Sequence, residues 1–199
     1  MTIQWVSIRV DDGSFVITDD GEIAAETLDF GTGLVGTMDV GAMVSTGIHT
    51  GQVKVCAATT AGPPQTGDFC DWDDVVEASV YAPHGDLRVS TLYFGPVVEL
   101  PALSHEGPGW YRLRVCARGR DTAPSNTVQS NDAERYSLVC WPAPRATPLI
   151  IRATDRTGQG LRAGAVHEID APDPPVPNTP DPQAELRRQN ILKAMRKPD

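Results

Sequence analysis

Short runs of β-branched and aromatic residues, separated by turns that contain glycine or proline, recur through the first 144 residues of this chain. Regular alternation of strand and turn signals predicts about eight to ten strands, and no long amphipathic pattern precedes residue 180. The 18 glycines and 17 prolines among 199 residues suit a fold rich in turns. We therefore expect an all-β fold, either an antiparallel β-sandwich or a partly closed barrel.

Turn residues mark where neighbouring strands should pair. Asp12-Gly13 separates IQWVSIRV from SFVIT, Thr50-Gly51 separates AMVSTGI from QVKVCAA, and residues 83–85 separate WDDVVEASVYA from DLRVSTLYF. The first two arrangements each predict a β-hairpin, and the third predicts two further strands joined by a turn. A longer polar loop, DTAPSNTVQSND, joins the last clear pair, WYRLRVCARG and ERYSLVCWPA.

The character of the chain changes after residue 144. TPLIIRAT allows one more strand, whereas APDPPVPNTPDPQ is rich in prolines, which favour extended structure. The final AELRRQNILKAMRK has helical composition, with Asp181 as a cap and Pro182 in the first turn. We expect a β-sandwich domain at residues 1–155, an extension and proline-rich linker at 156–182, and a short basic helix at 183–197.

Four arginines occupy alternate positions in the stretch GPGWYRLRVCARGRD. Because side chains alternate across a strand, Tyr111, Leu113 and Val115 should face the core. The arginines should then lie together on a solvated face; they are Arg112, Arg114, Arg118 and Arg120.

An acidic counterpart lies in DWDDVVEAS, where Asp71, Asp73 and Glu77 share one face by the same alternation. If the two strands are neighbours, opposite charges can meet across them and each pair contributes roughly 0.2–1 kcal/mol. An exposed charged ladder is our first expectation for these residues. A partner-binding face and an anion site remain as alternatives.

The sequence offers no pattern for a metal, a cofactor or catalysis. The carboxylates near Asp71 run along a strand rather than around a tight turn, so we expect no calcium site. The histidines, His49, His84, His105 and His167, lie far apart without ligand spacing. We expect a protein without cofactor, metal or catalytic residues, although histidines converging in a barrel would change that expectation.

The four cysteines and the N-terminus favour a reducing compartment. Cys56, Cys116 and Cys140 lie in apolar runs, which predicts buried thiols, and Cys70 lies in a loop. MTIQWVSIRVDDG lacks the features of a signal peptide, and no apolar run is long enough to span a membrane. We expect a cytoplasmic protein that does not bind a membrane.

Several segments together resemble a group of small actinobacterial cytosolic proteins. The resemblance rests on TGIHTGQVKV, WDDVVEASV, GPGWYRLRVCARGRD and ERYSLVCWPAP, and covers residues 40–144. It implies no activity. By size and fold type, the expected architecture is similar to that of small β-sandwich inhibitor and immunity proteins, such as the competence nuclease inhibitor ComJ.

The distribution of charge guides the functional hypothesis. Residues 1–144 hold 8 Lys+Arg against 19 Asp+Glu, a net charge of −11, which disfavours nucleic acid and favours a basic protein partner. We expect a non-enzymatic protein-binding module, such as an inhibitor or immunity-type protein. A ligand-binding or hydrolytic β-barrel that uses histidine and arginine, and a scaffold with a docking C-terminal helix, are the alternatives. The expected contact residues are Asp71, Asp73, Glu77, Arg112, Arg114, Arg118, Ile191, Leu192 and Met195.

Overall fold

A computed structural model describes residues 4–64, 69–123 and 127–164, with the backbone alone at 127–132. Within these ranges the chain forms eleven strands, a short 3-10 helix η1 and one α-helix. In chain order they are β1 (Val6–Val10), β2 (Ser14–Asp19), η1 (Ala25–Thr27), β3 (Val35–Thr37), β4 (Ala42–Ser45), β5 (Thr50–Thr59), β6 (Asp74–Ala82), β7 (Leu87–Thr91), β8 (Gly95–Pro96), β9 (Gly109–Arg118), β10 (Thr127–Pro142), β11 (Leu149–Ala153) and α1 (Arg156–Gly164).

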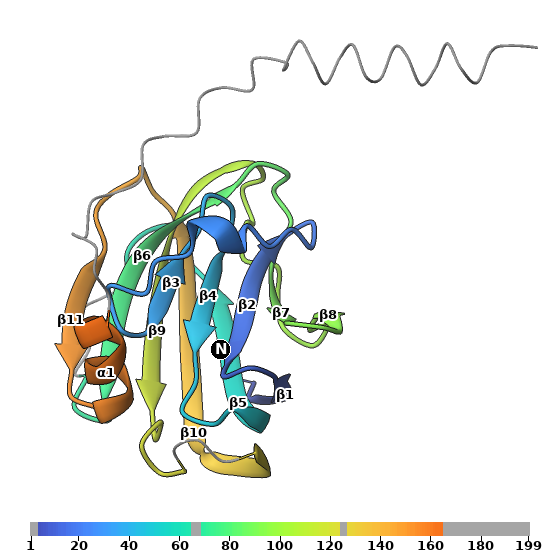
Figure 1. Ribbon diagram of the computed structural model, residues 1–199. Helices are drawn as coiled ribbons and strands as arrows, with labels where there is room; N and C mark the ends of the chain where they lie inside the picture. The colour runs from blue at the N-terminus through green and yellow to red at the C-terminus, as the bar shows by residue number, and fades with distance from the viewer. Residues whose placement is uncertain (1–3, 65–68, 124–126, 165–199) are drawn as a thin grey trace, which may run out of the picture.

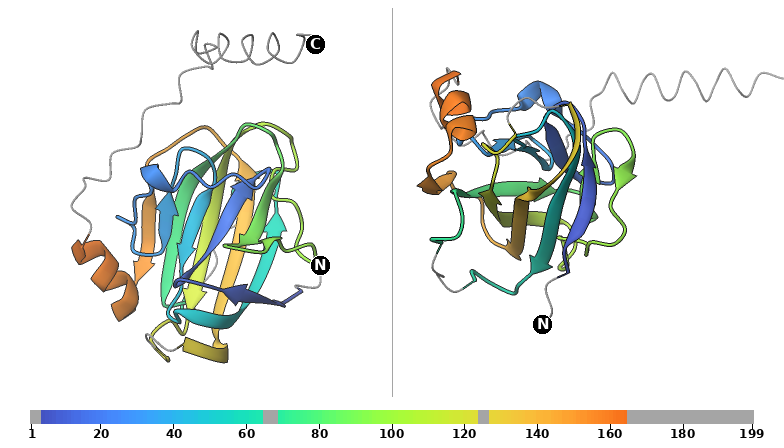
Figure 2. Two further views of the ribbon diagram at one scale, coloured as in Figure 1. Left: turned by 45° about the vertical axis from the view of Figure 1, so that its right-hand side comes forward. Right: turned by 90° about the horizontal axis from the view of Figure 1, so that it is seen from below.

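The strands form two sheets that face each other, so the predicted all-β sandwich is confirmed and the barrel is not closed (Figures 1 and 2). The larger sheet has the strand order β1-β5-β10-β9-β6-β11, and the smaller has the order β3-β4-β2-β7-β8. All pairings are antiparallel except that of β5 with β10, which is parallel. The expectation of a wholly antiparallel sandwich is therefore wrong at this one pair.

Neither of the two expected hairpins has both strands in the same sheet, whereas the expected last pair of strands does. Strands β9 and β10 are antiparallel neighbours in the larger sheet. In three other consecutive pairs, one strand lies in each sheet; these pairs are β1 and β2, β4 and β5, and β6 and β7. At the first corner, Asp12 and Gly13 take the positive φ values of 51° and 68° that a tight reversal requires. A turn dipeptide thus specifies that the chain reverses, and the burial of apolar faces decides which sheet the next strand joins.

The core lies between the sheets and follows the predicted alternation. Tyr111, Leu113 and Val115 of β9 are at most 2% exposed, as predicted from the sequence. Across the core, the rings of Phe15 from β2 and Tyr136 from β10 pack edge to face with centroids 5.2 Å apart. Residues from both sheets therefore build one continuous hydrophobic cluster.

Strand β11 and helix α1 follow the last long strand of the sandwich. Strand β11 pairs with β6, which accounts for TPLIIRAT, and helix α1 follows it directly. Residues 156–164 belong to the expected extension, and side chains at both ends of α1 contact the sandwich, as described below. The expected linker core at 171–182 and the helix at 183–197 lie outside the described residues. Among the described residues, no helix has the length and apolar character needed to cross a membrane.

Candidate functional site

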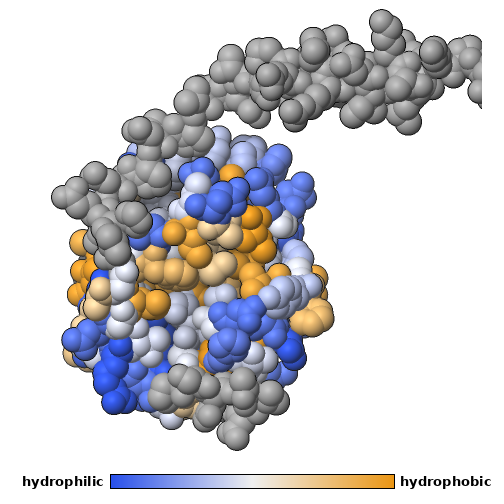
Figure 3. Space-filling model, in the orientation of Figure 1, coloured by the Kyte–Doolittle hydropathy of each residue, from blue (hydrophilic) through white to orange (hydrophobic). Residues whose placement is uncertain are grey.

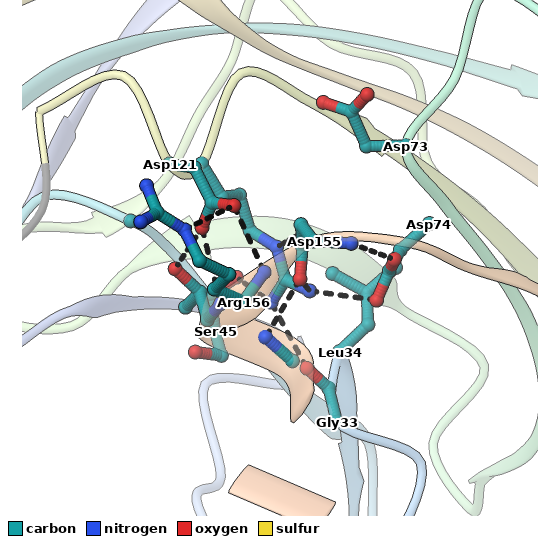
Figure 4. Close-up of polar contacts among 12 residues, drawn as sticks. Gly33, Leu34, Ser45, Asp73, Asp74, Asp121, Asp155 and Arg156 are labelled. Atoms are coloured by element: carbon teal, nitrogen blue, oxygen red, sulfur yellow. Dashed lines mark hydrogen bonds and ion pairs between the residues drawn. The ribbon is translucent and has the colours of Figure 1, made fainter. Parts of the chain in front are cut away.

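Arg120 forms the centre of a buried ion-pair network at the end of the sandwich next to α1 (Figure 4). Its Nε donates to Asp155 Oδ2 at 2.6 Å, and its Nη2 donates to Asp155 Oδ1 at 2.8 Å and to Asp74 Oδ2 at 3.0 Å. Its Nη1 donates to the carbonyl oxygens of Gly33 and Ser45. All five N–H donors of a guanidinium therefore have an acceptor, as complete burial of the charge requires.

Two carboxylates hold the N-terminus of α1 in this network. Asp155 is the N-cap and accepts the Gly158 N–H at 2.6 Å, while Asp121 accepts the N–H groups of Arg156 and Thr157. These bonds satisfy three of the four N–H groups that a helix leaves unpaired at its start, and the negative charges suit the helix dipole. Further along the helix, Arg162 donates to the Thr32 carbonyl oxygen and to Asp74.

A second buried carboxylate, Glu134, lies at the same end of the sandwich. Its Oε1 accepts the Gly47 N–H at 2.7 Å and the Tyr136 hydroxyl at 2.5 Å. Burial raises the pKa of Glu134, although the hydrogen bonds from Tyr136 and Gly47 oppose that rise. Burial likewise raises the pKa of Asp155, against the attraction of Arg120.

This network is closed to solvent. Arg120, Asp74 and Glu134 are each 0% exposed, and Arg120 has no free N–H with which to bind a ligand. The two arginines, Arg120 and Arg162, balance the two aspartates, Asp74 and Asp155. The arrangement therefore fixes α1 against the two sheets, and its central pair, Arg120 and Asp74, is closed to solvent.

The expectation that Arg112 and Arg114 are solvated is wrong. They are 7% and 8% exposed, and both bind Glu77 from the neighbouring strand β6. Arg114 donates from Nε to Glu77 Oε1 at 2.8 Å, and its guanidinium lies 5.3 Å and 5.6 Å from the ring centroids of Phe69 and Trp141. The predicted pairing of opposite charges across the two strands is therefore present at Glu77.

The segments that follow the strands explain why these arginines are covered. Phe69 belongs to the segment between β5 and β6, and the carbonyl oxygens of Ala146 and Thr147 accept hydrogen bonds from Arg112. Alternation predicts which face of a sheet a side chain occupies, but it does not predict what later segment crosses that face. The alternation in the sequence therefore predicts the charged face correctly, but it does not predict that two other segments bury it.

The remaining predicted contact residues do not come together. Arg118 is exposed as expected, and Asp71 is exposed in the turn before β6. Asp73 is half-buried and accepts the Gly119 N–H at 2.7 Å. Ile191, Leu192 and Met195 lie outside the described residues.

A different surface presents apolar side chains to solvent. Tyr93, Phe94 and Val98 are 65%, 71% and 81% exposed, and all three lie on or next to the β7–β8 connection. We call these three residues the aromatic surface. Strand β8 projects beside the sandwich (Figures 1 and 2), and hydrophobic colour reaches the right-hand edge of the molecule in Figure 3 where it lies.

Contacts with the β1–β2 corner hold the aromatic surface in place. The Tyr93 hydroxyl donates a short hydrogen bond to Asp12 Oδ2, which raises the pKa of Tyr93. The Arg9 guanidinium lies 5.5 Å from the centroid of the Phe94 ring and is itself oriented by a hydrogen-bonded pair with Asp11. Tyr93 and Phe94 thus each contact a charged residue of the β1–β2 corner.

Metal ligands and reactive thiols can be assessed directly within the described residues. No group of three or more histidine, cysteine, aspartate or glutamate side chains within them is arranged to hold a metal ion. Cys56, Cys70, Cys116 and Cys140 are free thiols, and burial raises the pKa of Cys116 and of Cys140 to about 12. A thiol with so high a pKa is a poor nucleophile at neutral pH.

Comparison with known proteins adds little to the geometry. No protein-family model matches the sequence, and no curated protein matches it. One solved structure, described as "Crocagin biosynthetic gene J", aligns with a TM-score of 0.41 and 13% sequence identity, over 71% of this chain and 99% of the other. A similarity of that size carries no conclusion about activity or partners.

Proposed function

We propose that this chain is a protein-binding module that docks a partner through the aromatic surface. The observation that carries the proposal is the exposure of Tyr93, Phe94 and Val98 within six residues of one another on a projecting connection. Monomeric proteins rarely leave large apolar side chains clustered in solvent, and aromatic residues dominate the binding energy of protein interfaces.

The environment of the aromatic surface suits an interface. Asp12, Arg9 and His49 surround it with polar groups, as the rim of a docking site requires. The Tyr93 ring is fixed by its hydrogen bond to Asp12, so little side-chain entropy is lost when a partner packs against it.

Charge favours a basic partner. Three of the eight basic residues in the first 144 are buried in ion pairs, namely Arg112, Arg114 and Arg120. The exposed surface is correspondingly acidic; its exposed carboxylates include Asp12, Asp20, Glu22, Glu26 and Asp39. An acidic inhibitor or immunity-type protein would use such a surface to accelerate association with a basic target.

Site-specific photo-crosslinking in the native cytosol tests the proposal. A benzophenone amino acid in place of Phe94 should crosslink to one protein in stoichiometric yield. The same amino acid in place of Leu149, which is 50% exposed on β11, is the matched control and should not. Equal crosslinking from both positions, or none from position 94, would remove the aromatic surface as the docking site.

A further inference from the structure

A cavity of about 280 Å³ opens at one end of the sandwich, where β5 and β10 meet the segment that follows β8. Most of its wall is apolar and comes from Ala57, Ala58, Leu100, Pro101, Leu138 and Val139. Leu100 and Leu138 belong to the hydrophobic core cluster, so the cavity reaches the core. Pro101 and Glu99 are exposed, so the cavity also reaches solvent.

Strand pairing explains why the space is not filled. Strand β1 pairs with β5 only as far as Val55, so within the described residues no strand borders β5 beyond that point on this side. The next residues that line the cavity on β5 include Ala57 and Ala58. Their side chains are too small to fill the space. The cavity is consequently open to solvent beside an apolar wall.

The size of the cavity suits a small molecule. An apolar protein cavity of about 150 Å³ binds benzene, and the present cavity of about 280 Å³ is larger than that. By proportion, about ten non-hydrogen atoms fit in the present volume. An aliphatic chain of about eight carbons with a polar head is therefore the appropriate length.

The polar groups of the cavity select the charge of that head. Glu99 supplies the one carboxyl group among the lining residues, and Gln4 and Ser137 supply amide and hydroxyl hydrogen-bonding groups. Cys56 also lines the cavity, and burial raises the pKa of its thiol, which stays neutral at physiological pH. A carboxylate at the mouth of an apolar cavity attracts a cation and repels an anion.

We propose that this cavity binds a small amphiphilic ammonium compound, with its aliphatic chain against Ala57 and Leu138 and its cationic head at Glu99. The inference does not depend on the protein-binding role proposed for the aromatic surface. It assigns a second site, whose Glu99 directly follows Val98 of the aromatic surface.

The test uses n-octylammonium and octanoate, which match in chain length and differ in the sign of the head group. Titration of the full-length, isotope-labelled chain should show saturable shifts at Ala57 and Leu138 with octylammonium, and binding of octanoate should be weaker by about tenfold or more. Glu99→Gln should reduce this preference to about threefold or less, because the charge is lost. The control Glu106→Gln, at another exposed carboxylate, should leave the preference unchanged.

Filling the cavity provides an independent test. Ala57→Leu places three additional carbons in the space and should weaken octylammonium binding by about tenfold or more without loss of folding. The matched control is Ala153→Leu, at an exposed position of β11. The proposal is overturned if octylammonium gives no saturable shifts, if octanoate binds equally well, or if Ala57→Leu binds as the wild type does.

Discussion

Arg120 and Asp155 form a two-pronged ion pair in which the arginine side chain has no exposed surface, with Nε–Oδ2 at 2.6 Å and Nη2–Oδ1 at 2.8 Å. Asp155 is at the same time the N-cap of α1. A single carboxylate thus joins Arg120, the second residue after β9, to the start of the helix. Because Asp155 both pairs with Arg120 and caps α1, the helix is packed as part of the sandwich.

Removing the arginine from this pair should destabilise the protein strongly. Arg120→Met keeps most of the side-chain volume but leaves Asp74 and Asp155 buried without their main cation. We expect the free energy of unfolding in urea to fall by about 3–5 kcal/mol. Arg118→Met, at an exposed position two residues earlier, should change it by no more than about 0.5 kcal/mol. Similar losses in the two variants would contradict the network described here.

The helix offers a matched pair of glycines. A Cβ at Gly158 would lie 2.6 Å from Arg120 Nη2 and from Asp74 Oδ2, whereas a Cβ at Gly160 meets nothing within 4 Å. Gly158→Ala should therefore destabilise by about 1–3 kcal/mol, since the buried network has to shift. Gly160→Ala should stabilise by about 0.5–1 kcal/mol, because alanine is the better helix former. Thermal unfolding of both variants measures the contrast, and destabilisation by both would argue against close packing of α1.

The attachment of the helix should depend on pH through Asp121. Burial alone would raise the pKa of Asp121, but the N–H groups of Arg156 and Thr157 outweigh it and lower that pKa below 3.8. A lowered pKa in the folded state gives stability that is present above 3.8 and is lost as the pH falls through the folded-state value. The stability difference between wild type and Asp121→Asn should accordingly shrink on acidification. A difference that stays constant or grows would show that the carboxylate does not hold the helix.

Because Arg112 and Arg114 are buried, their substitution should lower the free energy of unfolding. Arg114→Ala removes charge-assisted hydrogen bonds to Glu77 and the packing between Phe69 and Trp141, so we expect a loss of about 1.5–3 kcal/mol. Leu113→Ala, which creates a cavity in the core, should cost about 2–5 kcal/mol. Chemical denaturation of both variants provides the measurement. A change near zero in the free energy of unfolding for Arg114→Ala would instead indicate that Arg114 is solvated, as alternation alone suggests.

The sequence predicts the class of fold because strand periodicity and turn chemistry are local. Alternation assigned Leu113 to the core and Glu77 to the same face as Arg114, and the structure confirms both. Sheet membership is not local. The turn at Asp12-Gly13 joins two different sheets, although its residues are those of a hairpin.

The charged clusters show a second property that the strand pattern does not predict, namely the direction of side chains beyond a strand end. Strand β9 ends at Arg118, and Gly119, with a φ of +82°, turns the chain so that Arg120 points into the interior rather than along the strand face. No feature within the strand itself indicates that change of direction. The aromatic surface was missed for a similar reason, because Tyr93 and Phe94 lie in a stretch whose apolar pattern predicts a buried strand.

The dissociation constant of the crosslinked partner for Phe94→Ala is the measurement that tests the docking role of the aromatic surface most directly. A central interface anchor should cost about 2 kcal/mol or more, which is roughly a thirtyfold rise in the dissociation constant, and the stability of the free protein should be unchanged. Leu149→Ala, the control on β11, should bind within about twofold of wild type. An unchanged dissociation constant for Phe94→Ala would contradict docking through this surface.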